Sequence, residues 1–464
     1  MPVAVDFLSI GSGPAGQRAA VQAAKLGSRV ALVEKRRCIG GICVETGTIP
    51  SKTFREAVVQ VSRTTPGFER RLRPGTDHRP TAAELLSRVA HVVERESDII
   101  TRQLERNGVT VVSGTAAFRD AHTVDVDTED GPETITADAI VIAVGTEPAQ
   151  PPGVAVDGET VITSDDIMRL TRLPRSMVVV GAGIIGIEYA SMFAALGITV
   201  TVVDRRPRPL EFLDGEIVDE LIHQMRDRDV TFRLEEAVKH LDILDGSPRR
   251  TVTLLESGKQ IVSDMVFFSV GRQGAVGRLN LAAAGLAADE RGRISVDPEF
   301  QTAVPHIFAA GDVIGYPSLA ATSAEQGRRA ACHALGVPAG PMPDHFPVGI
   351  YAIPEISMVG ATEHDLTAQK IPYEAGVARY REIARGQILE DDTGLLKMLF
   401  HRDDRRLLGV HAIGTGATEL IHVGQAVLAL GGGLDYFLDT VFNYPTLAEC
   451  YKVAALNAAN KLVR

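Results

Sequence analysis

Cysteine is scarce in this sequence, with four residues among 464. So few cysteines in so long a chain exclude a disulfide framework, and no His or Cys cluster has the spacing of a zinc site, so we expect no metal. The sequence also lacks an uncharged run of membrane-spanning length: its most hydrophobic segment, Met177–Val203, contains Glu188 and several glycines. The N-terminal segment, Met1–Phe7, lacks the basic and apolar regions of a signal peptide. We therefore expect a cytoplasmic protein without a membrane segment.

Basic residues are outnumbered by acidic ones, 48 Lys and Arg against 59 Asp and Glu, for a formal net charge of −11. A general nucleic-acid binder needs a basic face, so we expect no nucleic-acid partner. The content of 45% hydrophobic and 23% charged residues is that of a globular protein. At this length, two to four domains acting on a small molecule are expected.

Two segments resemble each other at an offset of 170 residues, Phe7–Arg37 and Met177–Pro207. Each has an apolar strand, a glycine-rich turn, an Ala-rich helical stretch and a second apolar strand that ends in an acid. The coinciding residues are Gly11, Gly13, Gly16 and Glu34 in the first copy and Gly181, Gly183, Gly186 and Asp204 in the second. The repeat predicts two βαβ units.

Each position of the repeat has a physical purpose. The first glycine permits a tight turn, the second lets the backbone approach a pyrophosphate, and the third lets the helix pack on the strand. The helix N-terminus offers free N–H groups to phosphates, and the terminal acid is placed to accept hydrogen bonds from a ribose. A single glycine pattern would be weak, but two in register predict two bound dinucleotides.

The remaining sequence fits around these units. Thr81–Asn107 has helical periodicity, whereas Val109–Val126 and Ala139–Gly145 have the pattern of strands. From about Pro341 the pattern changes to alternating strands followed by a late pair of helices. We expect a separate domain to begin there.

Together these features resemble the flavoprotein disulfide reductases, and the resemblance spans the chain. The motifs that carry it, besides the two glycine turns with Glu34, are Gly40–Cys43, Gly47–Lys52, Ala143–Thr146, Gly271–Arg272, Ala310–Asp312 and Pro445–Glu449. The resemblance implies an α/β protein with two Rossmann-like dinucleotide-binding domains and a C-terminal α+β dimerisation domain. It implies an FAD-binding domain from residues 1–150 and 271–340, an NAD(P)-binding domain at 151–270 and a dimerisation domain at 341–464.

The same resemblance implies one non-covalent FAD per chain, NAD and NADP as substrates, and a homodimer or higher homo-oligomer whose sites are shared between chains. Lys52 would lie near flavin N5 and pair with Glu188 as the catalytic pair. Asp312 would contact the ribitol and pyrophosphate, and a helix starting near Ala320 would point at the flavin pyrimidine ring. The residues implied for FAD are Gly11, Gly13, Gly16, Glu34, Gly41, Cys43, Lys52, Gly145, Asp312 and Ala320. Those implied for NAD(P) are Gly181, Gly183, Gly186, Glu188, Asp204, Arg205, Arg206 and Gly271.

The sequence departs from that family at its thiol chemistry. Thr48 stands where the second redox cysteine would be, five positions after Cys43, and Tyr444 stands where the family has its general-base histidine. A tyrosine with a pKa near 10 cannot replace imidazole at neutral pH. Cys38 also lies five positions from Cys43, but before the Gly40–Gly41 turn. The sequence leaves open whether these two can bond, and we expect no catalytic disulfide there.

The departure resembles one branch of the family, the soluble pyridine nucleotide transhydrogenases. Its versions of three segments are similar to Gly47–Lys52, Gly311–Ala320 and Phe442–Thr446. The resemblance implies hydride transfer from NADPH to NAD through FAD without a redox-active disulfide. Only one second-type βαβ unit is present, so we expect ping-pong kinetics at one nicotinamide site.

The nucleotide turn predicts use of both nucleotides. Asp204 suits the 2′-hydroxyl of NAD, whereas Arg205, Arg206 and Arg208 supply the positive charge that a 2′-phosphate needs. For any single arginine, a solvated basic turn is the alternative. Two other functions remain open: an NAD(P)H dehydrogenase that reduces a quinone or oxygen, and a non-catalytic flavoprotein that senses redox state. The sequence does not encode the preferred direction of hydride transfer between the two nucleotides.

Overall fold

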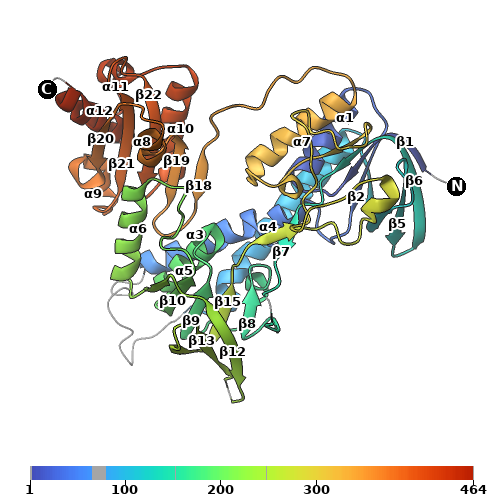
Figure 1. The fold of residues 1–464 in the computed structure, drawn as a ribbon, viewed down its shortest axis with the longest axis horizontal. Coiled ribbons are helices and arrows are strands. Elements are labelled where there is room, and N and C mark those ends of the chain that lie inside the picture. Colours follow the sequence, from blue (N-terminus) through green and yellow to red (C-terminus); the bar gives the residue numbers. More distant parts are fainter. Residues whose placement is uncertain (1–2, 65–79, 152, 247, 463–464) are drawn as a thin grey trace.

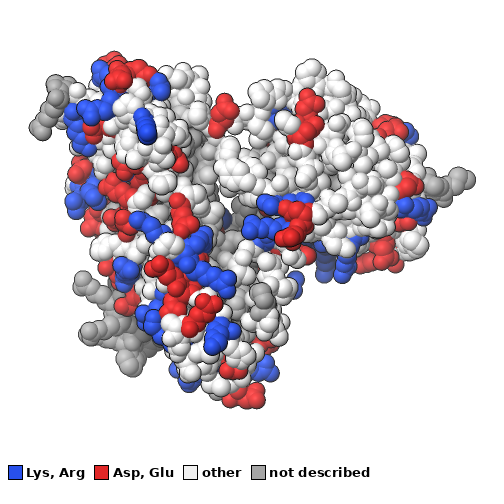
Figure 2. Space-filling model, in the orientation of Figure 1, with Lys and Arg blue, Asp and Glu red and all other residues white. Residues whose placement is uncertain are grey.

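The computed structural model describes residues 3–64, 80–151, 153–246 and 248–462. The chain forms three lobes (Figure 1): an N-terminal lobe that also contains α7, a middle lobe, and a C-terminal lobe drawn in orange and red. Within the described residues no helix is both long and apolar enough to cross a membrane. Lys and Arg side chains are interspersed with Asp and Glu over the face in Figure 2.

A seven-stranded sheet forms the N-terminal lobe. Along the sheet the strands are β3 (Thr110–Ser113), β2 (Val30–Glu34), β1 (Val3–Ile10), β6 (Gly131–Ile142), β5 (Thr123–Thr128) and β4 (Thr115–Phe118), with β17 (Ile307–Ala309) also paired to β6. The strands β1, β2, β3, β6 and β17 pair in parallel, whereas β4 and β5 are antiparallel. A parallel sheet must be covered on both faces, which is why β1 ends in a run of buried residues.

Helices cover this sheet. They are α1 (Pro14–Lys25), α4 (Ala82–Arg106) and α7 (Ala320–Ala334). Alanines on the inner face of α1 are small enough for α7 to approach its backbone, and a Cβ on Gly327 of α7 would meet Ala15 O at 2.0 Å. The prediction of a helix over Thr81–Asn107 is confirmed, because Thr81 caps α4 in a reciprocal capping box with Glu84.

The middle lobe repeats this plan with a five-stranded parallel sheet. Its strands in order are β11 (Thr231–Leu234), β10 (Thr199–Asp204), β9 (Ser176–Val180), β15 (Met265–Phe268) and β8 (Val161–Thr163). The helices are α5 (Ile184–Ala195) and α6 (Gly215–Asp227), and an antiparallel sheet is added by β12 (Val238–Leu244), β13 (Arg250–Leu255) and β14 (Gln260–Ser263). Both predicted βαβ units, β1–α1–β2 and β9–α5–β10, are therefore present.

Connecting elements lie between these two lobes. A two-stranded antiparallel ribbon joins β7 (Thr146–Pro148) to β16 (Arg272–Gly274). Two helices follow β2, α2 (Gly41–Glu45) and α3 (Thr48–Thr64), and Phe54 of α3 packs against Phe193 of α5 in the middle lobe. Short 3-10 helices occur at Ile167–Arg169, Leu281–Ala284, Asp312–Ile314 and Tyr380–Glu382.

An antiparallel five-stranded sheet forms the C-terminal lobe, as the change of pattern near Pro341 predicts. Its strands in order are β18 (Val348–Ile350), β19 (Ile356–Gly360), β22 (Leu407–Ile413), β21 (Leu395–His401) and β20 (Tyr373–Arg379). Its helices are α8 (Glu363–Ala368), α9 (Ala384–Ile388), α10 (Ala417–Ala429), α11 (Leu434–Asp439) and α12 (Glu449–Leu462). The expected late pair is thus three helices, because α11 is too short to have a recognisable helical period.

A buried cluster of ion pairs connects the C-terminal lobe to the middle lobe. Lys397 on β21 has 1% of its side chain exposed, and its Nζ lies 2.8 Å from Asp214 Oδ1 at the start of α6. The same Nζ lies 2.6 Å from Glu363 Oε2 of α8 and 3.1 Å from Glu216 Oε2. The middle lobe is therefore held against the C-terminal lobe at α6, the helix that follows the second βαβ unit.

Candidate active site

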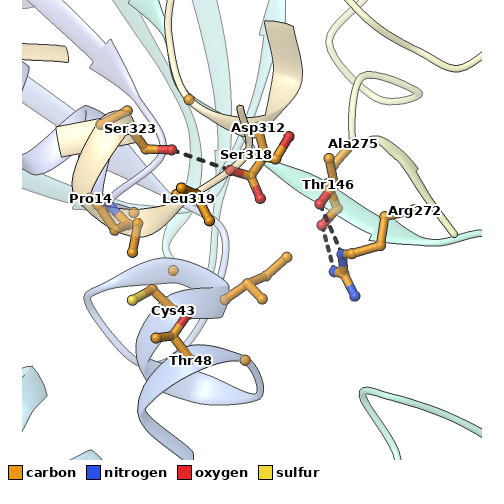
Figure 3. Close-up of a pocket in the computed structure, with 18 of the residues that line it drawn as sticks. Pro14, Cys43, Thr48, Thr146, Arg272, Ala275, Asp312, Ser318, Leu319 and Ser323 are labelled. Carbon is orange, nitrogen blue, oxygen red and sulfur yellow. Dashed lines mark hydrogen bonds between the residues drawn. The ribbon is translucent and has the colours of Figure 1, made fainter. Parts of the chain in front are cut away.

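One large cleft, of about 860 Å³, is lined by residues of all three lobes. The N-termini of α1 and α5 both reach it, so the two glycine turns open into the same space. Figure 3 shows part of the cleft, with Pro14, Leu319 and Asp312 on one side and Cys43 with Thr48 on the other. The arrangement brings the glycine turn of each α/β lobe to one cleft.

The three glycines of each turn have three different surroundings. Gly11 has a φ of +105°, and a Cβ on it would meet Ala143 O at 2.4 Å. A Cβ on Gly16 would lie 1.8 Å from Gly11 O, so this glycine lets α1 pack on β1. A Cβ on Gly13 would meet nothing within 4 Å and would project into the cleft. The second copy repeats this pattern at Gly181, Gly186 and Gly183.

The acid at the end of each unit is buried beside its own glycine turn. Glu34 Oε2 accepts from Ser12 N at 2.8 Å, and its Oε1 accepts from Arg36 N at 2.8 Å. Asp204 accepts in the same way from Ala182 N and, at 2.8 Å, from Arg206 N. These bonds fix the orientation of both carboxylates beside the glycine turns.

The arginines that follow the second acid have different partners. Arg206 bonds to Asp204 through its guanidinium, and although burial raises the pKa of Asp204, these hydrogen bonds lower it below the ordinary value. Arg208 bonds to Asp219 and to Gly215 O of α6, and Arg205 is exposed. All three lie outside the lining of the cleft.

At the centre of the cleft Lys52 and Glu188 form the ion pair that the family resemblance implies. Lys52 Nζ lies 2.9 Å from Glu188 Oε1 and 2.8 Å from Oε2. The Glu188 side chain is 4% exposed and that of Lys52 is 25% exposed, so Lys52 is the more exposed member of the pair. Tyr351, which the sequence analysis missed, donates its backbone N–H to Glu188 Oε1 at 2.8 Å.

Cys43, the cysteine that lines the cleft, does not form a disulfide. Cys43 and Thr48 lie close together in Figure 3, and all four cysteines are free. Burial raises the pKa of the Cys43 thiol, although a hydrogen bond with Thr48 acts in the opposite direction. Cys38 does not line the cleft and packs instead against the core of the N-terminal lobe. Tyr444 is 73% exposed and also lies outside the cleft lining.

The N-terminus of α7 and the residue Asp312 line the opposite wall. As expected from the sequence, α7 begins at Ala320, with Leu319 as its N-cap. Ser323 Oγ donates to Asp312 Oδ1 at 3.2 Å (Figure 3). Burial raises the pKa of Asp312, opposed by this hydrogen bond and by the charge of Arg272.

Arg272 is a second residue whose place the sequence analysis missed, although its motif was recognised. Its Nε donates to Thr146 Oγ1 at 2.9 Å and its Nη2 to Thr146 O at 3.0 Å (Figure 3). Its Nη1 reaches Ser164 Oγ at 3.1 Å and Asp165 Oδ1 at 3.3 Å. The guanidinium therefore links the ribbon between the lobes to the end of β8.

Most of the site residues predicted from the sequence line the cleft: Gly11, Gly13, Glu34, Gly41, Cys43, Lys52, Gly145, Gly183, Glu188, Gly271, Asp312 and Ala320. The other predicted site residues do not line the cleft: Gly16, Gly181, Gly186, Asp204, Arg205 and Arg206. No cluster of three metal-binding side chains occurs in the described part of the chain.

Known proteins match nearly the whole chain. A soluble pyridine nucleotide transhydrogenase of Mycobacterium bovis (strain BCG / Pasteur 1173P2) is 54% identical over 463 residues, which covers 98% of this chain and 97% of that protein. The protein of the same name from Vibrio vulnificus (strain YJ016) is 42% identical over 464 residues, with 98% of each chain covered. Among solved structures, the HOCl-induced flavoprotein disulfide reductase RclA from Escherichia coli has a TM-score of 0.88 and 26% identity, covering 97% of this chain and 99% of that one.

Family comparisons divide the chain near the point where its sequence pattern changes. The sequence model of the pyridine nucleotide-disulphide oxidoreductases matches residues 5–327. The model of the dimerisation domain of those proteins matches residues 346–455, which contain the antiparallel sheet and α10. The chain belongs to the pyridine nucleotide-disulphide oxidoreductase family.

Proposed function

We propose that this protein is an FAD-dependent enzyme that transfers a hydride between NADPH and NAD, without a redox-active disulfide. The observation that carries the proposal is the single cleft into which both glycine turns open, with Lys52 and Glu188 between them. The names of relatives 54% and 42% identical along the chain support the same reaction. Thr48 in place of a second cysteine supports a reaction without dithiol chemistry.

The residues of the N-terminal lobe fit FAD. Gly13 leaves room for a pyrophosphate, Glu34 presents carboxylate oxygens to a ribose, and the N-terminus of α1 favours phosphate charge. Thr46 Oγ1 is buried, lines the cleft and has no hydrogen-bond partner, so a polar ligand there would satisfy it. We assign FAD to residues 1–150 with 271–340, NAD(P) to 151–270 and dimerisation to 341–464.

When bound, FAD would supply the chemistry of accepting a hydride from one nicotinamide nucleotide and returning it to another. The chain's own contribution is to hold positive charge beside the reacting centre and to keep that charge balanced. Lys52 presents an ammonium to the cleft, and the buried carboxylate of Glu188 fixes its position through two hydrogen bonds. Preorganised charge of this kind acts more strongly in a water-poor cleft than in water.

The second glycine turn would bind either nucleotide at one site, so the two nucleotides would react in turn. Gly183 leaves space for the nicotinamide nucleotide's pyrophosphate, and Asp204 with Arg206 would meet its ribose or 2′-phosphate. The match of residues 346–455 to a dimerisation domain supports a homo-oligomer. We propose a cytoplasmic homodimer or higher homo-oligomer, and light scattering on the purified holoenzyme would test the oligomeric state.

An anaerobic two-step experiment tests the reaction. NADPH is added to the purified holoenzyme while flavin absorbance is recorded, and NAD is then added and NADH is quantified by chromatography over many turnovers. We expect flavin bleaching followed by stoichiometric NADH. Bleaching without transfer to NAD would overturn transhydrogenation and direct the search to quinones, oxygen or a protein partner. Initial rates that require a ternary complex would overturn the single nicotinamide site.

A further inference from the structure

A segment of the C-terminal lobe, residues 351–355, connects β18 to β19 and begins at the candidate active site, where Tyr351 lines the cleft. Its backbone is bonded to both neighbouring lobes. Tyr351 N donates to Glu188 Oε1, and Ile353 N donates to Ser191 Oγ of α5 at 3.0 Å. Arg55 Nε of α3 donates to Ala352 O at 3.0 Å. The segment is therefore held by the helices that carry Lys52 and Glu188.

The side chain of Tyr351 lies next to the ammonium of Lys52. Lys52 Nζ stands 4.9 Å from the centroid of the tyrosine ring, within the distance of a cation–π interaction. The ring also lines the cleft and is half-buried. Glu188 fixes the ammonium from one side, and the tyrosine ring supplies a second contact that carries no charge.

The phenol end of Tyr351 lies beside Thr418 of α10. Burial raises the pKa of Tyr351, opposed by a hydrogen bond with Thr418, so the ring stays neutral at physiological pH. Thr418 Oγ1 donates to Glu355 Oε2 at 2.9 Å, and Glu355 Oε1 lies 3.1 Å from Arg55 Nη2. Arg55 is on α3, one turn after Lys52. Through Glu355 and Arg55, these contacts connect Thr418 to α3, the helix that carries Lys52.

We propose that Tyr351 is a positioning residue for Lys52 in the hydride transfer. Its ring fixes where the ammonium stands, and its backbone N–H fixes the carboxylate that balances that charge. The inference rests on the proposed function, because it assigns Tyr351 to the same reaction. Without the ring, Lys52 would still form its ion pair with Glu188. Its flexible side chain could then adopt other rotamers that place the ammonium farther from the cleft.

Two substitutions separate the ring from its hydroxyl. In anaerobic single-turnover experiments on the holoenzyme, we expect Tyr351→Phe to reduce its flavin with NADPH within about twofold of the unaltered rate. Tyr351→Leu removes the ring and should slow flavin reduction by about tenfold. The concentration of NADPH at half-maximal rate should change less than about twofold.

A double-mutant cycle decides whether Tyr351 acts through Lys52. In a Lys52→Met background, adding Tyr351→Leu should slow flavin reduction by less than about twofold. A full tenfold loss in that background would overturn the proposal. Rates are expressed per bound flavin, and Tyr351→Met serves as a second ring-free variant if the leucine variant does not fold. The cycle uses NADPH alone, so failure of NAD as an acceptor, which would overturn the proposed function, is recorded separately.

Discussion

The guanidinium of Arg206 holds the carboxylate of Asp204 with two hydrogen bonds, Nη2 to Oδ2 at 2.7 Å and Nε to Oδ1 at 3.0 Å. Arg36 is its counterpart in the first βαβ unit, and its guanidinium turns away from Glu34 to bond Glu45. Of the two units, the second therefore pairs its terminal acid with a guanidinium, beside the turn to which we assign the nicotinamide nucleotide. A 2′-hydroxyl can use Asp204, whereas a 2′-phosphate can attract Arg206.

We expect Arg206→Ala to discriminate between the two nucleotides. Loss of a charge-assisted contact to phosphate should raise the KM for NADPH by about 10- to 100-fold, while the KM for NADH should change less than about threefold. Steady-state kinetics with each nucleotide measure both values. Arg208→Ala is the comparison, because Arg208 is already bonded to Asp219 on α6. An equal rise in both KM values for Arg206→Ala would contradict a role in recognising the 2′-phosphate.

The sequence predicted the parts of the site that lie within one local unit, but not those formed by long-range contacts. Glu34 and Asp204 were identified because each lies at a fixed spacing from its own glycine turn, inside one local unit. Tyr351 reaches Glu188 across 163 positions and Arg272 reaches Thr146 across 126, so no local pattern could indicate either contact. Lys52 and Glu188 were paired only through the family resemblance. Local periodicity thus predicted the dinucleotide folds, but long-range packing completes the site.

Cys43 should be dispensable for turnover. It has no disulfide partner, and burial raises the pKa of its thiol, so it is protonated at neutral pH. We expect Cys43→Ser to keep its hydride-transfer rate within about threefold, because serine replaces the thiol with a group of similar size. Alkylation of Cys43 by iodoacetamide at pH 7 should be slow. A loss of about 100-fold or more in Cys43→Ser, with FAD retained, would instead require thiol chemistry.

The ionic cluster at Lys397 should make the stability of the protein depend on pH. Burial alone would raise the pKa of Asp214, but His411 and Lys397 lower it below its ordinary value. Burial alone would lower the pKa of Lys397, but its carboxylate partners raise it. Asp214 therefore stabilises the fold above its unfolded pKa, and this contribution is lost as pH falls through its lowered folded pKa. Lys397 stabilises the fold below its unfolded pKa, and its contribution is lost above the raised folded value.

Lys397→Met should consequently destabilise the holoenzyme most near neutral pH. Removing the ammonium leaves three carboxylates close together, which should cost about 3–5 kcal/mol and, in a chain of this length, lower Tm by about 3–5 °C. The deficit should shrink toward pH 4, because the carboxylates can then bind protons. Lys461→Met is the control, because Lys461 is exposed and its pairing with Glu374 is worth at most about 1 kcal/mol. A deficit that stays constant between pH 8 and pH 4 would show that lost packing, not charge, is responsible.

Gly13 and Gly183 should separate the two nucleotide sites without harming the fold. A Cβ on Gly13 would meet no protein atom within 4 Å, and one on Gly183 would approach only Arg206 Nη2, at 4.0 Å. Neither glycine has a positive φ. We therefore expect Gly13→Ala and Gly183→Ala to fold normally, each with one bound dinucleotide displaced by the added methyl group.

The expected losses are different in the two variants. Gly13→Ala should bind FAD at least about tenfold more weakly, whereas Gly183→Ala should keep its FAD and show a KM about tenfold higher for both nicotinamide nucleotides. Flavin content after dialysis and steady-state kinetics measure these effects. Gly11→Ala is the contrasting variant, because its φ of +105° and the 2.4 Å approach to Ala143 O predict a folding defect. If Gly183→Ala lost FAD while Gly13→Ala retained it, the assignment of the two βαβ units would be reversed.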